Sequence, residues 1–588
     1  MIPEKGTPPR KKIRIGEMLV NEGIITDEQL MSALASQKKT GSKLGNTLIE
    51  LGLVTTQQFH EFLATQLNLS YIDLKFYNYS LETVRLLPET AARRFRAMVL
   101  SQEDGHVLVA VADPTDIYAY DELTKILRQP VRLAVVYESE LLKALDTVYR
   151  RTQEIVTIAG ELGEELSQGD STLESMLTEA DVEDAPVVRL LKSLFEDAVQ
   201  VGASDIHIEP DEKVLRIRQR VDGILHEQVM KERRIAPALV SRLKLVCGLD
   251  ISERRLPQDG RFNIKIKGRS IDIRLSTMPL QFGESVVMRL LDQSNGILRL
   301  EQVGMPDDLL KRFRRQLHQP HGLVLVTGPT GSGKTTTLYG ALNELNSNEK
   351  KIITVEDPVE YRLPRINQVQ VHPKIGLDFA RVLRAGLRQD PDIVMVGEMR
   401  DKETSDIALR AAMTGHLVLS TLHTNDAVST ALRLIEMGAE GYVVASSLRA
   451  VLAQRLVRRI CESCVRPEPL EPGTRSWLNG YRGHTSLPTQ PVTFKKGRGC
   501  PSCNNTGYSG RIGIFELLEI NFDLADALRR NDSAGFAKIA QHMKGFVSLV
   551  DSALMLAIEG VTSMDEVLRV AGETDESLQL AEQDVSTM

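Results

Sequence analysis

The segment that most constrains this 588-residue chain is Gly328-Pro329-Thr330-Gly331-Ser332-Gly333-Lys334-Thr335, which fits the phosphate-loop pattern G-x-x-x-x-G-K-[ST]. An apolar run at residues 323–326 predicts a buried strand before it, and residues 336–342 predict a helix after it. The glycines let backbone N–H groups surround phosphates without Cβ clashes, and the helix N-terminus adds partial positive charge. We therefore assign ATP binding to residues 328–335 and Thr336, with Lys334 on the terminal phosphates and the Thr335 hydroxyl on Mg²⁺. A glycine-rich turn that binds nothing is the alternative.

Length and charge narrow the class of protein. At the usual domain size, 588 residues correspond to about three to five domains. A formal net charge of −7 gives no general attraction to nucleic acid, which is bound largely by neutralising its phosphates. No apolar run approaches the ~18 residues of a membrane span, and no apolar segment follows the basic residues 10–14. We expect a cytoplasmic chain that meets a membrane only through a partner.

Residues 14–37 recur as residues 43–66, a repeat of 24 residues with five residues between the copies. In each copy a glycine ends a short helical pattern (Gly23 or Gly52), and a threonine stands where it would N-cap a second helix (Thr26 or Thr55). Apolar residues at i and i+4 predict that these helices pack on one another as an adaptor. A ligand site is the other interpretation, because each copy begins with a cation and ends with a glutamine whose amide can pair with a base edge.

The doubled motif resembles the N-terminal domain of pilus-assembly ATPases of the mannose-sensitive haemagglutinin (MSHA) type, which binds cyclic di-GMP. The resemblance implies that the ligand contacts matching positions of both copies. These are Arg14, Ile15, Gly16, Leu19, Leu30, Leu34 and Gln37, then Lys43, Leu44, Gly45, Leu48, Phe59, Leu63 and Gln66. Ile15 replaces the usual leucine, and Lys43 replaces an arginine without its bidentate fork. Asp113, after a predicted strand, is a further candidate, although an aspartate before proline commonly shapes a turn.

The next two segments complete the N-terminal half. Strand-like runs at residues 107–111 and 131–136 alternate with helical ones, which predicts a small α/β part within an N-terminal domain of residues 1–150. Residues 161–184 carry nine Asp or Glu and no Lys or Arg. That composition predicts a solvated, flexible linker, which we assign to residues 151–185.

Residues 186–300 form a predicted middle domain, with a helix at 187–194 and strands at 205–209, 214–223 and 286–291. Its segments Ala-Ser-Asp-Ile-His-Ile-Glu (203–209), Leu-Pro-Gln-Asp-Gly-Arg (256–261) and Asp-Ile-Arg-Leu-Ser-Thr (272–277) resemble the middle domain of type II secretion and type IV pilus assembly ATPases. The resemblance implies a PAS-like α/β fold whose arginines reach the nucleotide. Arg261 and Arg274 are the candidates, although a solvated sheet face would also carry arginines.

Three apolar runs after the phosphate loop predict buried strands that end in polar residues: Glu356 in residues 352–360, Glu398 in 393–401 and His423 in 417–425. Ligands of parallel sheets bind at the carboxyl ends of the strands, where a carboxylate can hold Mg²⁺ through water or polarise the attacking water. This order of motifs resembles the secretion ATPase superfamily across residues 186–570 and implies a RecA-like core at 301–572. We assign Glu398 as general base or metal-water ligand and Glu356 as supporting carboxylate, with exchangeable roles. His423 or His416 would sense the γ-phosphate.

Four of the five cysteines fall into two C-x-x-C pairs, Cys461 with Cys464 and Cys500 with Cys503. Four thiolates suit tetrahedral, structural Zn²⁺, whereas a redox site would need a thioredoxin-like βαβ unit around one pair. Assembly ATPases of the resembled family carry such an element and retraction ATPases lack it, which favours extension. Cys247 is predicted to be a small core residue.

The remaining predictions concern the C-terminus and the function. Residues 515–570 are predicted to be helical and residues 573–588 disordered. The resemblance implies a Mg²⁺-dependent ATPase that forms a homohexamer, acts on an inner-membrane platform protein to extend an MSHA-type pilus, and is regulated by cyclic di-GMP. A type II secretion ATPase is the nearest alternative, and a nucleic-acid translocase and a non-catalytic dinucleotide sensor are the others.

Overall fold

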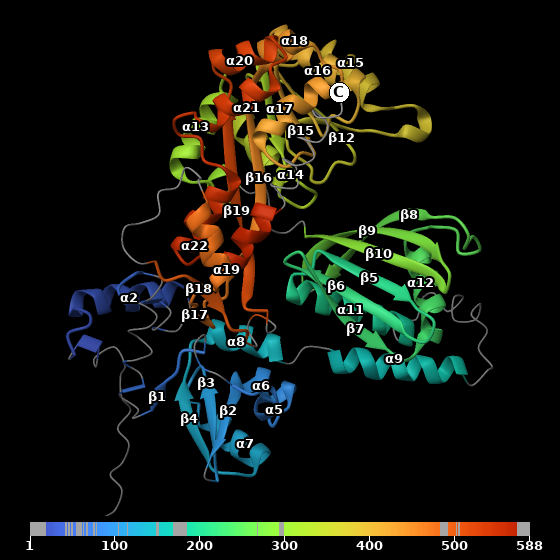
Figure 1. Ribbon diagram of the computed structural model, residues 1–588. Coiled ribbons are helices and arrows are strands. Elements are labelled where there is room, and N and C mark those ends of the chain that lie inside the picture. Colours follow the sequence, from blue (N-terminus) through green and yellow to red (C-terminus); the bar gives the residue numbers. More distant parts are fainter. Residues whose placement is uncertain are drawn as a thin grey trace, which may run out of the picture. The chain divides into compact units, whose positions relative to one another are not determined.

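The computed structural model describes residues 19–20, 22–40, 44, 47–48, 51–54, 62, 64–65, 69–74, 77, 79–103, 105–114, 116–148, 152–167, 185–266, 268–292, 299–481, 492–500, 503 and 506–572 (Figure 1). The chain divides into two compact units, residues 1–150 with 500–504 and residues 151–499 with 505–588. Within the described residues, no helix combines the length and the apolar character needed to cross a membrane.

The two repeats contribute matching residues to one apolar cluster. Leu19 and Leu48, Ile25 and Val54, and Ala33 and Phe62 are three pairs that stand 29 residues apart in the sequence, and all six side chains are buried together. Helix α2 (Asp27–Thr40) begins with the predicted cap, because the Gln29 N–H donates to Thr26 Oγ1 at 3.3 Å and the Thr26 N–H donates to Gln29 Oε1 at 2.9 Å. Gly23 and Gly52 both have positive φ, at 71° and 67°, as expected after a helix. Thr55 lies outside the described residues.

A small α/β sheet follows in the same unit, with strand order β1-β4-β3-β2. The strands are β1 (Ser70–Tyr71), β2 (Ala97–Glu103), β3 (His106–Val111) and β4 (Val131–Val135), and the helices are α5 (Leu81–Val84), α6 (Glu89–Phe95), α7 (Ile117–Leu127) and α8 (Glu138–Val148). β4 pairs in parallel with β1 and β3, whereas β2 and β3 are antiparallel. The two strands predicted at residues 107–111 and 131–136 are thus confirmed.

The linker prediction is wrong for residues 152–167. They form helix α9 (Thr152–Ser167), whose Ile155 and Leu162 are fully buried against α11 (Pro186–Val201) of the middle domain. Arg189 on α11 donates to Glu161 Oε2 of α9 at 2.9 Å. The acidic residues of α9 lie between apolar positions of helical period, and those positions determine the structure. Residues 168–184 lie outside the described residues.

The middle domain is a six-stranded antiparallel sheet of order β7-β6-β5-β10-β9-β8, covered by helices. Its strands are β5 (Asp205–Pro210), β6 (Leu215–Val221), β7 (Ile224–Met230), β8 (Gln258–Ile266), β9 (Arg269–Leu280) and β10 (Gly283–Asp292), with α12 (Ala236–Val246) and η1 (Arg233–Ile235). Cys247 is half-buried against this core, and burial raises the pKa of its thiol to about 11.

The C-terminal core is a seven-stranded sheet of order β13-β12-β14-β15-β11-β16-β19, parallel except for the last pair. The strands are β11 (Gly322–Thr327), β12 (Ile352–Glu356), β13 (Asn367–Gln370), β14 (Ile393–Val396), β15 (Leu417–Leu422), β16 (Leu448–Ile460) and β19 (Tyr508–Glu519). The core also contains the helices α13 (Asp307–Leu317), α14 (Lys334–Leu345), α15 (Phe379–Leu387), α16 (Lys402–Met413), α17 (Ala427–Glu436), α18 (Gly441–Ser447), α19 (Pro472–Gly480), α20 (Phe522–Arg529), α21 (Ser533–Gln541) and α22 (Leu549–Ile558). Shorter elements are η2 (Leu300–Val303), η3 (Pro373–Ile375), β17 (Val465–Pro467) and β18 (Lys495–Gly497).

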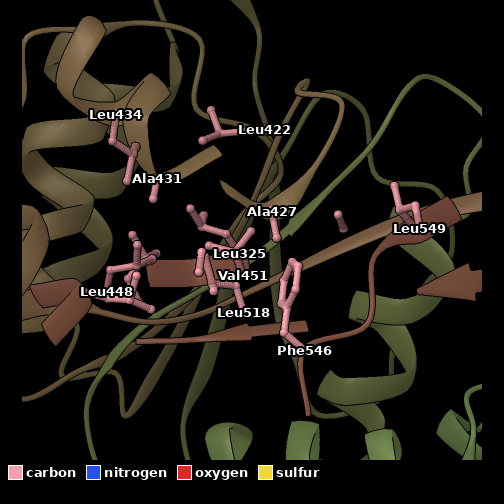
Figure 2. Close-up of a cluster of buried hydrophobic side chains, with 14 of the residues drawn as sticks. Leu325, Leu422, Ala427, Ala431, Leu434, Leu448, Val451, Leu518, Phe546 and Leu549 are labelled. Atoms are coloured by element: carbon pink, nitrogen blue, oxygen red, sulfur yellow. The ribbon is translucent and has the colours of Figure 1, made fainter. Parts of the chain in front are cut away.

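Successive residues of the core strands face opposite sides of the sheet. Leu325 belongs to one buried cluster and Val324 to another, as expected for a strand covered on both faces. Figure 2 shows Leu325, Val451 and Leu518 from three strands together with Ala427, Ala431 and Leu434 of α17. The helix predicted from residue 515 is wrong at its start, because residues 515–519 belong to β19 and pair antiparallel with β16.

Candidate functional site

The phosphate loop connects the carboxyl end of β11 to the start of α14, as the pattern predicts. Gly328 and Gly333 have φ of 142° and 89°, and a Cβ on either would lie within 2.7 Å of Gln454. Glycine is therefore required at both positions for conformation and for space. Among the described residues, the buried Ser332 Oγ has no hydrogen-bond partner, which fits an incoming oxyanion. Thr330, Thr335 and Thr336 are exposed at the loop and the start of α14.

The Lys334 ammonium group lies against the loop itself. Its Nζ donates to the carbonyl oxygens of Gly328 at 2.7 Å and Pro329 at 3.1 Å. Burial lowers the pKa of Lys334 to about 8, and the charge of Glu398 opposes that shift. Lys334 and Glu398 therefore belong to one electrostatic site.

Glu356 ends β12 inside a closed hydrogen-bond network. Its carboxylate accepts from the hydroxyls of Tyr339 and Thr354, and from Gln368 Nε2 at 3.2 Å. Burial and the charge of Glu356 raise the pKa of Tyr339. With three donors around it, this carboxylate is only 3% exposed. The arrangement suits a fixed structural role better than direct contact with the attacking water.

Glu398 follows β14 and is the more accessible carboxylate, with its side chain 14% exposed. One oxygen pairs with Arg400, and the other lies 3.5 Å from His423 Nε2. The hydrogen bond to Glu398 raises the pKa of Arg400, whereas burial and then the charge of Lys334 lower the pKa of His423. The structure thus brings Lys334, Glu398 and His423 together.

His416 stands apart from this group. It precedes β15, at the end of the strand opposite to His423, and its Nδ1 lies 3.1 Å from the Ala411 carbonyl oxygen. Because the two histidines lie at opposite ends of one strand, only His423 is placed to contact a phosphate bound at the loop.

Arg261 and Arg274 are directly opposed residues on β8 and β9 of the middle domain. Both are paired with carboxylates: Arg261 Nε donates to Asp272 at 2.8 Å, and Arg274 lies 2.6 Å from Glu360 Oε2. The hydrogen bond to Asp272 raises the pKa of Arg261. The two residues line a cavity of about 610 Å³ with Asp357 and Gln370.

Four arginines that we did not predict lie beside the phosphate loop. Arg455, Arg458, Arg511 and Arg569 line a cavity of about 560 Å³ together with residues 329–332 of the loop. Glu566 holds two of them, since Arg458 and Arg569 both donate to its carboxylate. The run Gln-Arg-Leu-Val-Arg-Arg at 454–459 could have indicated these arginines, because charged residues are unusual in a buried strand inside a sheet.

The four paired cysteines converge. The Sγ atoms of Cys461, Cys464, Cys500 and Cys503 lie within 4.8 Å of one another, and three of the four residues are buried. The antiparallel pair β17–β18 joins the segments beside the two C-x-x-C turns, with Val465 opposite Gly497. Four converging thiol groups in a mostly buried site fit a tetrahedral zinc ion.

The predicted cyclic di-GMP residues are described only in part. Leu19, Leu30 and Leu48 are buried in the repeat cluster, Leu34 and Leu44 pack against it, Gln37 is half-buried and Asp113 is exposed. Arg14, Ile15, Gly16, Lys43, Gly45, Phe59, Leu63 and Gln66 lie outside the described residues. The described leucines therefore form the packing framework of the repeat.

Comparison with known proteins decides the family. The family model of type II/IV secretion system proteins matches residues 180–569, which is more than half of the chain. The chain belongs to the type II/IV secretion system protein family. Within this family, the type IV pilus assembly ATPase PilB of Myxococcus xanthus is 40% identical over 94% of this chain and 98% of its own length. The type II secretion system ATPase E of Vibrio cholerae is 42% identical over 84% of this chain and 98% of its own length.

The N-terminal half matches separately. The MshEN domain model covers residues 67–155, which are the α/β sheet and its helices and not the repeats. The solved structure of MshE with cdg is 39% identical and covers 24% of this chain and 100% of its own, at a TM-score of 0.23. Family membership and the phosphate-loop geometry together identify the C-terminal core as an ATPase of the secretion and pilus-assembly family.

Proposed function

We propose that this ATPase drives extension of a type IV pilus of the MSHA type and is regulated by cyclic di-GMP. The observation that carries the catalytic part is the convergence of Lys334, Glu398 and His423 at the carboxyl edge of the core sheet. The similarity to a pilus assembly ATPase over 94% of the chain supports the proposal that hydrolysis drives pilus extension.

In the proposed reaction, the phosphate loop and Lys334 hold the β- and γ-phosphates, and Glu398 accepts the proton of the attacking water. Arg400 and His423 fix the orientation of the Glu398 carboxylate from its two oxygens. Mg²⁺, which the exposed Thr335 hydroxyl would help hold, neutralises phosphate charge when bound. Arg261 and Arg274 would complete the site only after leaving Asp272 and Glu360.

Three observations support cyclic di-GMP as the regulator. The MshEN model matches residues 67–155, the 24-residue motif is doubled upstream of that match, and matching residues of the two copies pack together. The ligand would contact the arginine, lysine and glutamine positions of the repeats. A homohexamer acting on an inner-membrane platform protein is the assembly that we propose for this motor, with Zn²⁺ as a structural ion at the four cysteines.

The alternative is an ATPase of type II secretion, because ATPase E of Vibrio cholerae is as similar in identity as the pilus enzyme. Deleting the gene from its own host distinguishes the two, since one function predicts loss of surface pili and the other loss of secreted proteins.

The biochemical test uses the full chain. We expect ATP hydrolysis that Lys334→Ala abolishes and that cyclic di-GMP changes at least about twofold, with calorimetry reporting binding of the dinucleotide. Gln37→Ala should weaken that binding about tenfold and leave basal hydrolysis intact. Wild-type protein that shows no heat with cyclic di-GMP would rule out the regulatory proposal and leave the ATPase assignment standing.

A further inference from the structure

Gln454 is a buried polar residue that the catalytic scheme does not use. It lies on β16, which runs parallel to β11 with Ala453 opposite Thr327, so that Gln454 stands beside Gly328 at the start of the phosphate loop. Its side chain is 1% exposed. A buried amide is costly unless both its donor and its acceptor are paired.

Both ends of the Gln454 amide are paired with the phosphate-loop region. Nε2 donates to the carbonyl oxygen of Ser332 at 2.7 Å, and Oε1 accepts from Thr337 Oγ1, also at 2.7 Å. Ser332 belongs to the loop and Thr337 to the first turns of α14. One side chain of the neighbouring strand therefore ties the loop to the helix that follows it.

The loop also rests against Gln454. A Cβ on Gly328 would lie 2.2 Å from the Gln454 carbonyl oxygen, and a Cβ on Gly333 would lie 2.7 Å from Gln454 Nε2. Real Cβ atoms do not approach so closely, so the loop packs directly on the backbone of Gln454 at Gly328 and on its side-chain amide at Gly333.

We propose that Gln454 is the positioning residue of the phosphate loop, which holds the loop backbone so that its N–H groups point at the nucleotide phosphates. Both polar atoms of the Gln454 amide are engaged with protein groups of the loop and of α14, so its effect on the nucleotide passes through the loop. The inference rests on nucleotide binding at this loop and is independent of the pilus role and of cyclic di-GMP.

The test replaces only the donor end of the amide. Gln454→Glu keeps the shape but, when ionised, has no proton for the Ser332 carbonyl oxygen. At a pH high enough to ionise the new carboxyl group, we expect the full chain to bind a fluorescent, non-hydrolysable ATP analogue at least about tenfold more weakly than wild type. Gln319→Glu is the matched control, because the same change falls on an exposed residue after α13 and should leave binding unchanged.

A pH series separates positioning from general damage. A protonated glutamic acid can donate to Ser332 and accept from Thr337 as glutamine does, and burial raises the pKa of a carboxyl group. The ratio of the dissociation constants of Gln454→Glu and wild type should therefore fall toward one as the pH is lowered. Damage to the fold would not be repaired by acid.

Thr337→Val provides an independent variant, since it removes one of the two hydrogen bonds and keeps the side-chain shape. We expect it to weaken analogue binding about threefold, and to have little further effect when Gln454 is already changed. Dissociation constants within twofold of wild type for both variants across the pH series would overturn the inference alone. Wild-type protein that fails to bind the analogue, or Lys334→Ala that binds it equally well, would overturn the nucleotide assignment as well.

Discussion

At the scale of single residues, two glutamates that both stand at the end of an apolar run in the sequence have different surroundings in the structure. Glu356 ends one buried strand, and Glu398 follows another at the same edge of the core sheet. Glu356 is enclosed by donors from Tyr339, Thr354 and Gln368, whereas Glu398 faces Arg400 and His423 at the phosphate loop. The surroundings favour Glu398 as the base and Glu356 as the anion that orders the strand end.

This assignment predicts a split between activity and stability. Glu398→Gln should lower kcat at least about 100-fold with nucleotide affinity within about threefold, because only proton transfer is lost. Glu356→Gln should lower the free energy of unfolding by about 1–3 kcal/mol, because one amide hydrogen would face a hydroxyl donor. Turnover assays and thermal melts of the two proteins measure this. Near-normal turnover by Glu398→Gln, with loss of turnover in a fully stable Glu356→Gln, would reverse the roles.

The sequence predicted the site residues that stand in recognisable motifs. It missed residues whose role depends on which elements lie side by side in the fold. Lys334, Glu398 and His423 stand in recognisable motifs, and the structure places them together. Gln454 was not predictable, because its role depends on which strand lies beside the phosphate loop. That neighbour, β16, lies more than 100 residues downstream in the sequence.

At the scale of elements, β19 is the strand whose end we predicted to be a helix. A short apolar run with a single glutamate does not distinguish a buried strand from a helix, and we predicted a helix at residues 515–518. In the strand, Glu516 is buried and its two oxygens accept from the N–H groups of Ala427 at 2.7 Å and Leu549 at 3.1 Å. These are the first residues of α17 and α22, so one carboxylate caps two helices.

This double cap predicts a dependence of stability on pH. Burial, and then the charge of Asp426, raise the pKa of Glu516 above its ordinary value of 4.5, while the two N–H groups and Arg455 oppose the shift. The folded state therefore holds the proton more tightly than the unfolded state. The stability contributed by Glu516 is present below the ordinary value and is lost as the pH rises through the raised pKa.

Melting temperatures measured over a pH series test this prediction. Replacing Glu516 by glutamine should remove that part of the pH dependence and lower stability at acidic pH. Glu559→Gln, at an exposed position at the end of α22, should leave the wild-type profile unchanged. An identical slope in the Glu516→Gln protein would show that the residue does not titrate in this range.

At the scale of the whole molecule, motifs and composition predicted the order of the domains. They did not predict that the middle domain begins with α9. Acidic composition alone assigned residues 151–185 to a linker, while the apolar period within residues 155–162 placed α9 on the middle domain. Composition averages over a segment, whereas burial depends on where its few apolar residues fall.

The cysteine cluster gives a prediction at this scale. Elemental analysis of the full chain should find close to one zinc per chain, and Cys461→Ser should release it and lower the melting temperature. Cys247→Ser should keep the zinc, because Cys247 packs in the middle-domain core away from the cluster. Zinc content well below one in the wild-type protein would exclude the proposed ion.

The packing of α9 determines where a stable fragment of this chain can begin. A fragment that begins at residue 186 would lack Ile155, Ile158 and Leu162, whose burial stabilises the chain by about 1.5–3 kcal/mol for each side chain, and would expose the apolar surface of α11 that they cover. We expect that fragment to aggregate in light-scattering measurements and one that begins at residue 151 to stay monodisperse. After cleavage by a protease at residue 167, only non-covalent contacts should join α9 to the middle domain. We therefore expect α9 to separate from the middle domain only when that domain unfolds.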